Sequence, residues 1–213
     1  MSPSGPPKAG GNSRSVADTD DPLEALARAY ALKDETRTGW QLREVEDPES
    51  VAAHTWGVTT LVVRFCPADL DRERALALAA VHDVAEAETG DVATRAEAGA
   101  QTVDAAEKAS RERAAIEGPL AGLGEEMRAL WSEYEARESP EARFVKDMDL
   151  LDTCLQALVY EREGRYEPGG DAFQEYDRLD EFFATSEPRL STERGRTLFE
   201  RVRRKYEAAR GEG

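Results

Sequence analysis

Apolar residues along this chain recur at intervals of three and four positions, and no segment shows the strict alternation of a β-strand. Asp21-Pro22 is typical of a helix start, because Asp21 can cap a helix and Pro22 can occupy its first position. Similar patterns recur to the C-terminus and predict an all-α protein. Helices are expected over residues 22–33 and 47–65, and a third is expected to run from a cap at Asp69 or Asp71 to Gly90. Further helices are expected over residues 102–116, 127–134, 140–163, 171–185 and 190–209.

Three segments lack this pattern. Residues 1–20 are rich in Gly, Pro and Ser, which predicts a disordered tail in front of a single domain over residues 21–210. Residues 37–48 are expected to connect two helices. Residues 92–99 are expected to form a loop that is long enough to act as a pocket wall or a lid.

Composition narrows the class of protein. Hydrophobic residues make up 40% of the 213 residues, and there is no apolar run of 18 or more and no secretory apolar segment at the N-terminus. Cys66 and Cys154 form no spaced disulfide framework. These features predict a cytoplasmic protein with reduced thiols and no membrane partner.

The chain is strongly acidic, with a formal net charge of −16. This charge argues against a nucleic-acid partner, because phosphate-backbone binding depends on clustered Lys and Arg. A small anionic substrate remains compatible with it if a metal ion and a few arginines line the pocket. In the alternative interpretation the acids simply form solvated helix faces.

The densest group of chemically active side chains lies between His82 and Asp91. His82 and Glu86 are four residues apart, so on a continuous helix they share a face beside Asp83, and Gly90 is expected to end that helix. A lone histidine is more often a hydrogen-bonded core residue than a ligand. A histidine and two acids in a half-buried helix, however, carry a large desolvation cost unless a cation neutralises them. The stretch therefore predicts a divalent transition metal.

Other candidates lie elsewhere in the chain. Arg37 and Trp40 precede a helix that carries His54, the only other histidine, and can bind an anion and stack on a flat ring. Equally compatible with the spacing is a core role for Trp40 and a solvated Arg37. A later helix carries three acids among apolar residues, and helical spacing alone does not choose between them. These acids are Asp147, Asp149 and Asp152.

The order of His54, His82-Asp83 and a later acid resembles the H…HD…D signature of the HD-domain metal-dependent phosphohydrolases. Longer motifs resemble the 5′-deoxynucleotidase subfamily, and together the resemblance covers roughly residues 22–185. These motifs are Arg37-Thr38-Gly39-Trp40, residues 48–54, His82-Asp83-x-x-Glu86-x-x-x-Gly90-Asp91 and Phe144-Val145-Lys146-x-x-Asp149.

The resemblance implies a helical HD-domain bundle that holds one divalent ion, which would be Mn, Co, Zn, Fe, Ni or Mg. It also implies that the protein hydrolyses 2′-deoxyribonucleoside 5′-monophosphates and forms a homodimer. Its metal ligands are expected to be His54, His82, Asp83 and Asp149. Glu86 is expected to transfer the proton, and Asp91 to orient the water or the sugar. Arg37 is expected to clamp the phosphate, and Trp40 to pack against the nucleoside.

Two other HD branches fit the sequence less well. Guanosine tetraphosphate hydrolases usually carry His-Asp-x-x-Glu-Asp, whereas Ala87 follows Glu86 here. Binuclear cyclic-nucleotide phosphodiesterases need more than two histidines. The open alternatives are a phosphatase for another nucleotide-like metabolite and a non-catalytic helical metal-binding module.

Overall fold

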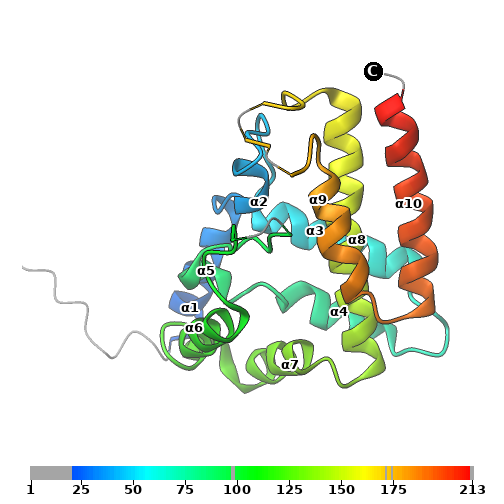
Figure 1. Cartoon of the computed structure of the whole chain (residues 1–213). Helices are drawn as coiled ribbons and strands as arrows, with labels where there is room; N and C mark the ends of the chain where they lie inside the picture. Colours follow the sequence, from blue (N-terminus) through cyan, green and yellow to red (C-terminus); the bar gives the residue numbers. More distant parts are fainter. Residues whose placement is uncertain (1–20, 97–98, 171, 174, 212–213) are drawn as a thin grey trace, which may run out of the picture.

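The predicted all-α architecture is confirmed in a computed structural model, which describes residues 21–96, 99–170, 172–173 and 175–211 (Figure 1). Within these residues the only β-type pairing is an isolated bridge between Thr36 and Ser50. The predicted tail over 1–20 lies outside the described residues. The helices are α1 (Pro22–Ala29), η2 (Tyr30–Lys33), α2 (Thr38–Gln41), α3 (Val51–Phe65), α4 (Arg72–Val81), α5 (Glu86–Thr89), α6 (Ala105–Glu117), η3 (Ala121–Leu123), α7 (Gly124–Ala136), α8 (Pro140–Glu163), α9 (Asp180–Ser186), η4 (Glu187–Arg189) and α10 (Glu193–Gly211).

Local sequence sets where several helices begin. The side chains of Asp21, Ser50 and Ser139 accept hydrogen bonds from backbone N–H groups in the first turns of α1, α3 and α8. Of the two predicted caps for α4, the structure uses Asp71, which accepts from the N–H of Arg74 at 3.0 Å. These caps satisfy N–H groups that have no partner within the helix.

The predicted continuous helix through the His82 stretch is wrong. Helix α4 ends at Val81, and the turns that follow are closed by bonds from residue i to i−3, such as Val84 N–H to Val81 C=O at 3.1 Å. Nδ1 of His82 instead hydrogen-bonds to the carbonyl oxygen of Ala79. In a continuous helix that oxygen would accept from the backbone N–H of residue 83. Gly90, with φ 73°, ends α5 as predicted.

The predicted helix over 171–185 forms only from Asp180 onward. The described residues just before it are held in an irregular path by tertiary contacts. Gly169 donates to the carbonyl of Asp177 at 2.8 Å, and the ring of Phe173 packs on that of Tyr166 with centroids 5.5 Å apart. These contacts outweigh the local helical pattern.

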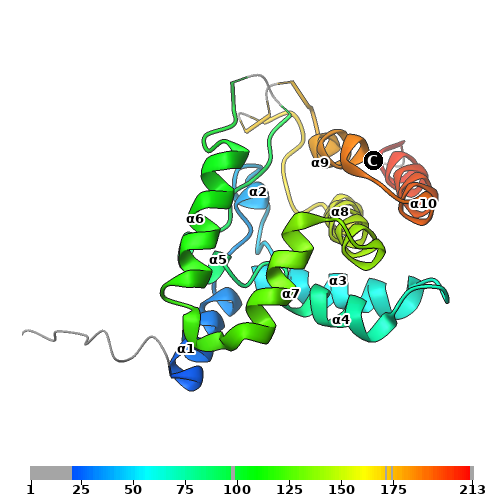
Figure 2. The same ribbon diagram turned by 90° about the horizontal axis from the view of Figure 1, so that it is seen from below.

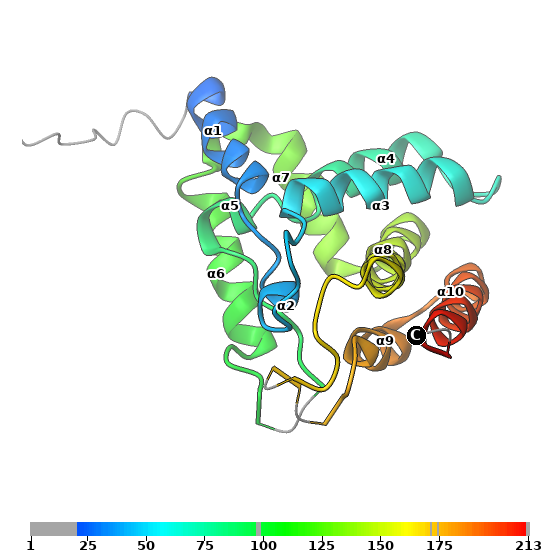
Figure 3. The same cartoon turned by 90° about the horizontal axis from the view of Figure 1, so that it is seen from above.

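Helix α8 is the central element. It packs against α3 and α4 on one side and against α9 and α10 on the other, as Figures 2 and 3 show from opposite directions. More than half of its residues are buried, including Phe144, Met148 and Leu151. Chemically active side chains on α8 therefore face several neighbouring helices. In the part of the chain that the structure describes, no helix has both the length and the apolar character needed to cross a membrane.

Candidate active site

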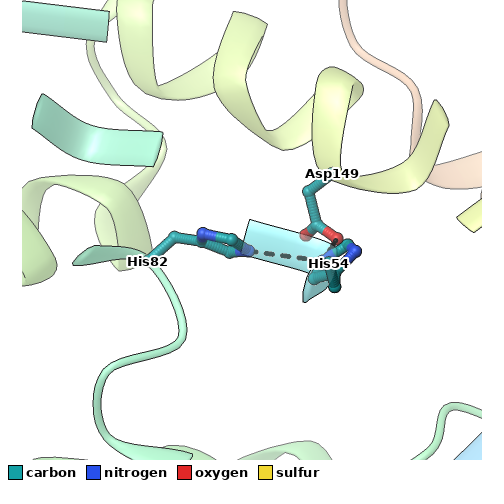
Figure 4. A group of neighbouring side chains, drawn as sticks. All are labelled: His54, His82 and Asp149. Atoms are coloured by element: carbon teal, nitrogen blue, oxygen red, sulfur yellow. Dashed lines mark hydrogen bonds and ion pairs between the residues drawn. The ribbon is translucent and has the colours of Figure 1, made fainter. Parts of the chain in front are cut away.

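The four side chains predicted to bind metal come from three separate elements. His54 lies on α3, His82 lies in the turn after α4, and Asp149 lies on α8 (Figure 4). Asp83 follows His82 in the same turn. The Nε2 atom of His54 is 3.4 Å from Nε2 of His82 and 3.2 Å from Oδ1 of Asp149. The Oδ2 atom of Asp83 is 3.1 Å from Nε2 of His82 and 3.7 Å from Nε2 of His54. His54, His82 and Asp149 offer ligand atoms that all lie within 4.8 Å of one another, and Asp83 lies beside both histidines. These four residues are hereafter the metal cluster.

Hydrogen bonds to the far side of each imidazole leave Nε2 as the atom that could bind a metal ion. Nδ1 of His82 lies 2.8 Å from the carbonyl oxygen of Ala79, which can only accept, so Nδ1 carries the proton. Nδ1 of His54 lies 2.7 Å from Oδ2 of Asp152 and donates in the same way. When both imidazoles are neutral, as in a metal-bound site, their Nε2 lone pairs therefore point at each other and at two carboxylates.

This arrangement fits a divalent cation. Four acceptor atoms that face one another repel, and a cation among them removes the repulsion and can be bound by all four. The two histidines are almost fully buried, which strengthens both effects. Mixed imidazole and carboxylate ligands, with imidazoles oriented by a carbonyl and a carboxylate, are typical of transition-metal sites.

The three acids of α8 have three different surroundings. Asp149 Oδ2 accepts from Tyr134 Oη at 2.7 Å and from Lys146 Nζ at 2.6 Å, which leaves Oδ1 for the metal cluster. Burial raises the pKa of Asp149, but Lys146 and His54 hold it well below its usual range. Asp152 orients His54. Asp147 points away and accepts from the backbone N–H groups of residues 191 and 192.

Gly57 makes room for the contact between α3 and Asp152. A Cβ at position 57 would lie 2.1 Å from Oδ1 of Asp152, so any larger residue there displaces the carboxylate that holds His54. The sequence carries a weak signal for this role, because a glycine inside a helical pattern often marks close packing.

A cavity of about 430 Å³ opens beside the metal cluster. Its lining includes Asp83 and Asp149 of the cluster together with Arg37, Glu86 and Asp91. Helix α6, the segment after Asp91 and helix α9 supply much of the remaining wall. The fold therefore gathers candidate metal ligands, an acid and an arginine around one cavity.

Glu86 is placed to hold a proton next to this space. It is only 4% exposed, and Oε1 accepts from Lys108 Nζ at 3.0 Å. Oε2 is buried and has no hydrogen-bond partner among the described residues. Burial, followed by the charge of Asp83, raises the pKa of Glu86 well above its ordinary value, against the opposing effect of Lys108.

Arg37 and Asp91 are tied together at the cavity wall. Asp91 Oδ2 accepts from the N–H of Thr38 at 2.5 Å, and Thr38 Oγ1 donates back to the carbonyl of Asp91 at 2.8 Å. Arg37 is half-buried and donates to Thr153 Oγ1 at 3.2 Å. Burial lowers the pKa of Arg37, but Asp91 and Glu49 more than offset this, so its charge is permanent.

Trp40 is a core residue. It is 1% exposed, its Nε1 donates to Glu49 Oε1 at 3.0 Å, and its ring packs on Phe182 with centroids 4.0 Å apart. It does not belong to the cavity lining, so the structure favours the alternative in which Trp40 fills the core. This arrangement gives no support to the predicted contact between Trp40 and a nucleoside. The Trp40 ring instead packs in the core, on the side of the Arg37 segment away from the cavity.

Sequence reasoning assigned no role to several residues that hold the site together. Lys146 lies inside the motif that ends at Asp149, but the motif assigns no function to it. Helical spacing does not distinguish Asp152 from the other two acids of the same helix. Tyr134 resembles any member of an apolar stripe, and Lys108 resembles any charged residue of a surface helix. Only their packing distinguishes them.

Comparison with known proteins is consistent with this geometry. A family model of the HD domain matches residues 29–190. The chain is 39% identical over 173 residues to 5′-deoxynucleotidase HDDC2 of Danio rerio, covering 79% of each protein. It is 36% identical over 151 residues to 5′-deoxynucleotidase HDDC2 of Homo sapiens, covering 69% of this chain and 71% of that protein.

Solved structures agree with the fold. The PH0347 protein of Pyrococcus horikoshii OT3 is similar with a TM-score of 0.67 and 29% identity, over 87% of this chain and 98% of that one. A predicted metal-dependent phosphohydrolase of Magnetospirillum magnetotacticum MS-1 is similar with a TM-score of 0.54 and 27% identity, over 86% of this chain and 92% of that one. The match over residues 29–190 and the convergence of the four candidate ligand side chains lead to one conclusion: the chain belongs to the HD domain family.

Proposed function

We propose that this protein is a metal-dependent phosphomonoesterase that hydrolyses 2′-deoxyribonucleoside 5′-monophosphates to a deoxynucleoside and phosphate. The observation that carries the proposal is the metal cluster beside a cavity that also contains Arg37 and a buried, protonatable Glu86. The names of the relatives in Danio rerio and Homo sapiens support the substrate class.

In this proposal the metal is held by His54, His82, Asp83 and Asp149. Their imidazole and carboxylate atoms suit Mn, Co, Zn, Fe, Ni or Mg. When bound, such an ion lowers the pKa of its bound water to roughly 7 and offsets charge on phosphoryl oxygens.

The chain's own residues supply the remaining chemistry. Water attacks the phosphorus as the bond from phosphorus to the 5′ oxygen breaks, and Glu86 delivers a proton from Oε2 to that oxygen. The guanidinium group of Arg37, whose charge is permanent, binds the phosphoryl oxygens in a bidentate manner. Asp91 fixes the Arg37 segment through Thr38 and orients the attacking water or the sugar.

Three further properties belong to the proposal. The proposal that the protein forms a homodimer rests on the family resemblance. A cytoplasmic location is supported by Cys66 and Cys154, which are both free and buried. A small-molecule substrate rather than a nucleic acid is supported by the net charge of −16.

The test is phosphate release from a panel of 5′-deoxynucleoside, 5′-ribonucleoside and 3′-nucleoside monophosphates. Metal-stripped protein is resupplied with Mn, Co, Zn or Mg, and His82→Ala serves as the inactive control. We expect release only from the 5′-deoxy substrates and only with an intact His82. If metal-loaded protein released no phosphate from any of these substrates, the result would instead favour another nucleotide-like substrate or a non-catalytic metal-binding module.

A further inference from the structure

Lys108 joins helix α6 to the acid beside the metal cluster. Its Nζ atom lies 3.0 Å from Oε1 of Glu86 and also contacts Oε1 of Glu112, one turn further along α6. The two acidic side chains are only 5% and 6% exposed, and all three residues line the cavity. One ammonium group is therefore shared between two buried acids, and one of these acids is the proposed proton donor.

A second ion pair on α6 shows what such a pair is like at the surface. Arg111 and Glu107 are also four residues apart, but their side chains are 53% and 48% exposed, and exposed pairs contribute little to stability. Burial lowers the pKa of Lys108, but Glu86 and Glu112 more than offset this, so its charge is permanent. Burying charged groups is costly, and apolar residues often replace a buried ion pair without loss of stability. Stability alone therefore does not account for these three groups.

The contact with Lys108 distinguishes the two oxygens of Glu86. Oε1 accepts from Nζ, whereas Oε2 is buried and has no hydrogen-bond partner in the part of the chain that the structure describes. An ammonium group can only donate, so the oxygen that faces it must accept, and a proton on Glu86 belongs on Oε2. Lys108 thus fixes the orientation of the carboxyl group and the oxygen from which a proton can leave.

We propose that Lys108 is a positioning residue for Glu86: it holds Oε1 so that the proton is transferred from Oε2, and Glu112 holds Lys108 in place. This role rests on the proposed function, because it concerns the proton that Glu86 gives to the 5′ oxygen. In that step the O–H bond of Glu86 breaks, an O–H bond to the 5′ oxygen forms, and the resulting carboxylate keeps its contact with the ammonium group. Lys108 does not touch the substrate in this role, so its loss should affect kcat and not KM.

The test measures kcat and KM for deoxyadenosine 5′-monophosphate in metal-loaded K108M, with R111M on the exposed face of the same helix as the matched control. Misplacement of a catalytic group costs up to about 100-fold in rate, so we expect kcat of K108M to fall by about 10–100-fold. KM and bound metal per chain should be unchanged, and R111M should behave like the wild type. Circular dichroism checks the fold. E112Q, which removes the second anchor of Lys108, replaces K108M if that variant does not fold, with the same expected split between kcat and KM.

A double-mutant cycle tests whether Lys108 acts through Glu86. If it does, K108M should cause no further loss of kcat in the E86Q background, because residues that act as a unit have non-additive effects. A kcat of K108M equal to that of the wild type, losses that multiply in K108M/E86Q, or a raised KM in K108M would each overturn the inference.

Chemical labelling of Lys108 separates this inference from the proposed function, because it needs no turnover. Acetic anhydride reacts with the neutral amine, so Lys108 should react about tenfold or more slowly than the exposed Lys205, and the difference should shrink in E112Q. Rapid labelling of Lys108 in the wild type would overturn the inference and leave the proposed function intact. Slow labelling in a wild type that releases no phosphate from 5′-deoxynucleotides would confirm the contact and count against the proposed function.

Discussion

At the scale of single residues, the geometry of the metal cluster depends on side chains that are not among its proposed ligands. Asp152 holds the imidazole of His54 through Nδ1, and Gly57 gives Asp152 the space to do so. Partners of this kind fix the tautomer and orientation of a ligand, and their loss typically weakens metal binding by about 10–100-fold.

Gly57→Ala should therefore weaken metal binding although residue 57 is not a ligand. The new methyl group collides with Asp152 and turns its carboxylate away from His54. We expect the Kd for Mn or Co to rise about 10–100-fold. Thr60→Ala, on the exposed side of the same helix, is the matched control and should bind metal like the wild type. Equal affinities for the two variants would exclude the steric role of Gly57.

Glu86→Gln tests proton transfer without changing the size of the side chain. The amide has no acidic proton to give to the leaving oxygen, whereas the metal cluster stays intact. We expect kcat to fall by about 10²–10⁴-fold while the bound metal per chain is unchanged. Turnover close to that of the wild type would remove Glu86 from the proton-transfer step.

At the scale of elements, α8 divides its acids between the site and the fold. Asp149 faces the metal cluster, whereas Asp147 accepts hydrogen bonds from the N–H groups of Ser191 and Thr192 at the start of α10. Gly195 permits this contact, because a Cβ there would lie 2.2 Å from Oδ2 of Asp147.

Asp147→Ala should reduce stability without affecting metal content. The substitution removes a fully buried carboxylate that accepts from N–H and O–H groups at the start of α10, so we expect the free energy of unfolding in urea to fall by about 2–4 kcal/mol. Glu163→Ala, at the exposed end of α8, controls for the loss of one acid. Loss of metal from folded Asp147→Ala would show that Asp147, and not Asp149 alone, belongs to the cluster.

The elements that the sequence predicts well are those whose signals are local. The cap at Asp21 and the stop at Gly90 act within a few residues, and the structure confirms them, whereas the helix expected from residue 47 begins only at Val51, after a cap at Ser50. The break after Val81 and the late start of α9 were missed, because side-chain and tertiary contacts outweigh helical periodicity there.

The same distinction applies to the site. Residue types and spacing pointed to His54, His82 and Asp83, but the choice of Asp149 among the three acids of α8 depended on the resemblance of its motif to that of a known family. They could not show that Trp40 is buried, that Lys108 contacts Glu86, or that Asp152 orients a histidine, because each of these depends on how distant helices pack.

At the scale of the whole molecule, one buried acid joins distant parts of the chain. Glu181 on α9 is 3% exposed and contacts Arg43, which lies shortly after α2. It also accepts from Arg95 Nε at 2.9 Å and from the N–H of Ala96 at 2.8 Å. Burial raises the pKa of Glu181, but these partners together hold it below its ordinary value of 4.5.

This linkage predicts a pH-dependent contribution to stability. Because the folded-state pKa of Glu181 is depressed, its ionised form stabilises the fold above pH 4.5, and the contribution disappears as pH falls through the folded-state value. Glu181→Gln should reduce the free energy of unfolding by about 3–5 kcal/mol at pH 7. Urea unfolding at pH 7 and at lower pH should show the gap between variant and wild type shrinking in acid. A constant gap would contradict the assignment.

The central claim is that His54, His82, Asp83 and Asp149 bind one divalent ion. Its most direct test is metal content per chain, measured by mass spectrometry after loading with Mn or Co and removal of free metal. We predict one ion per chain in the wild type and in Asp147→Asn, and almost none in His82→Ala or Asp149→Asn with helicity preserved. Stoichiometric metal in folded His82→Ala would contradict the account.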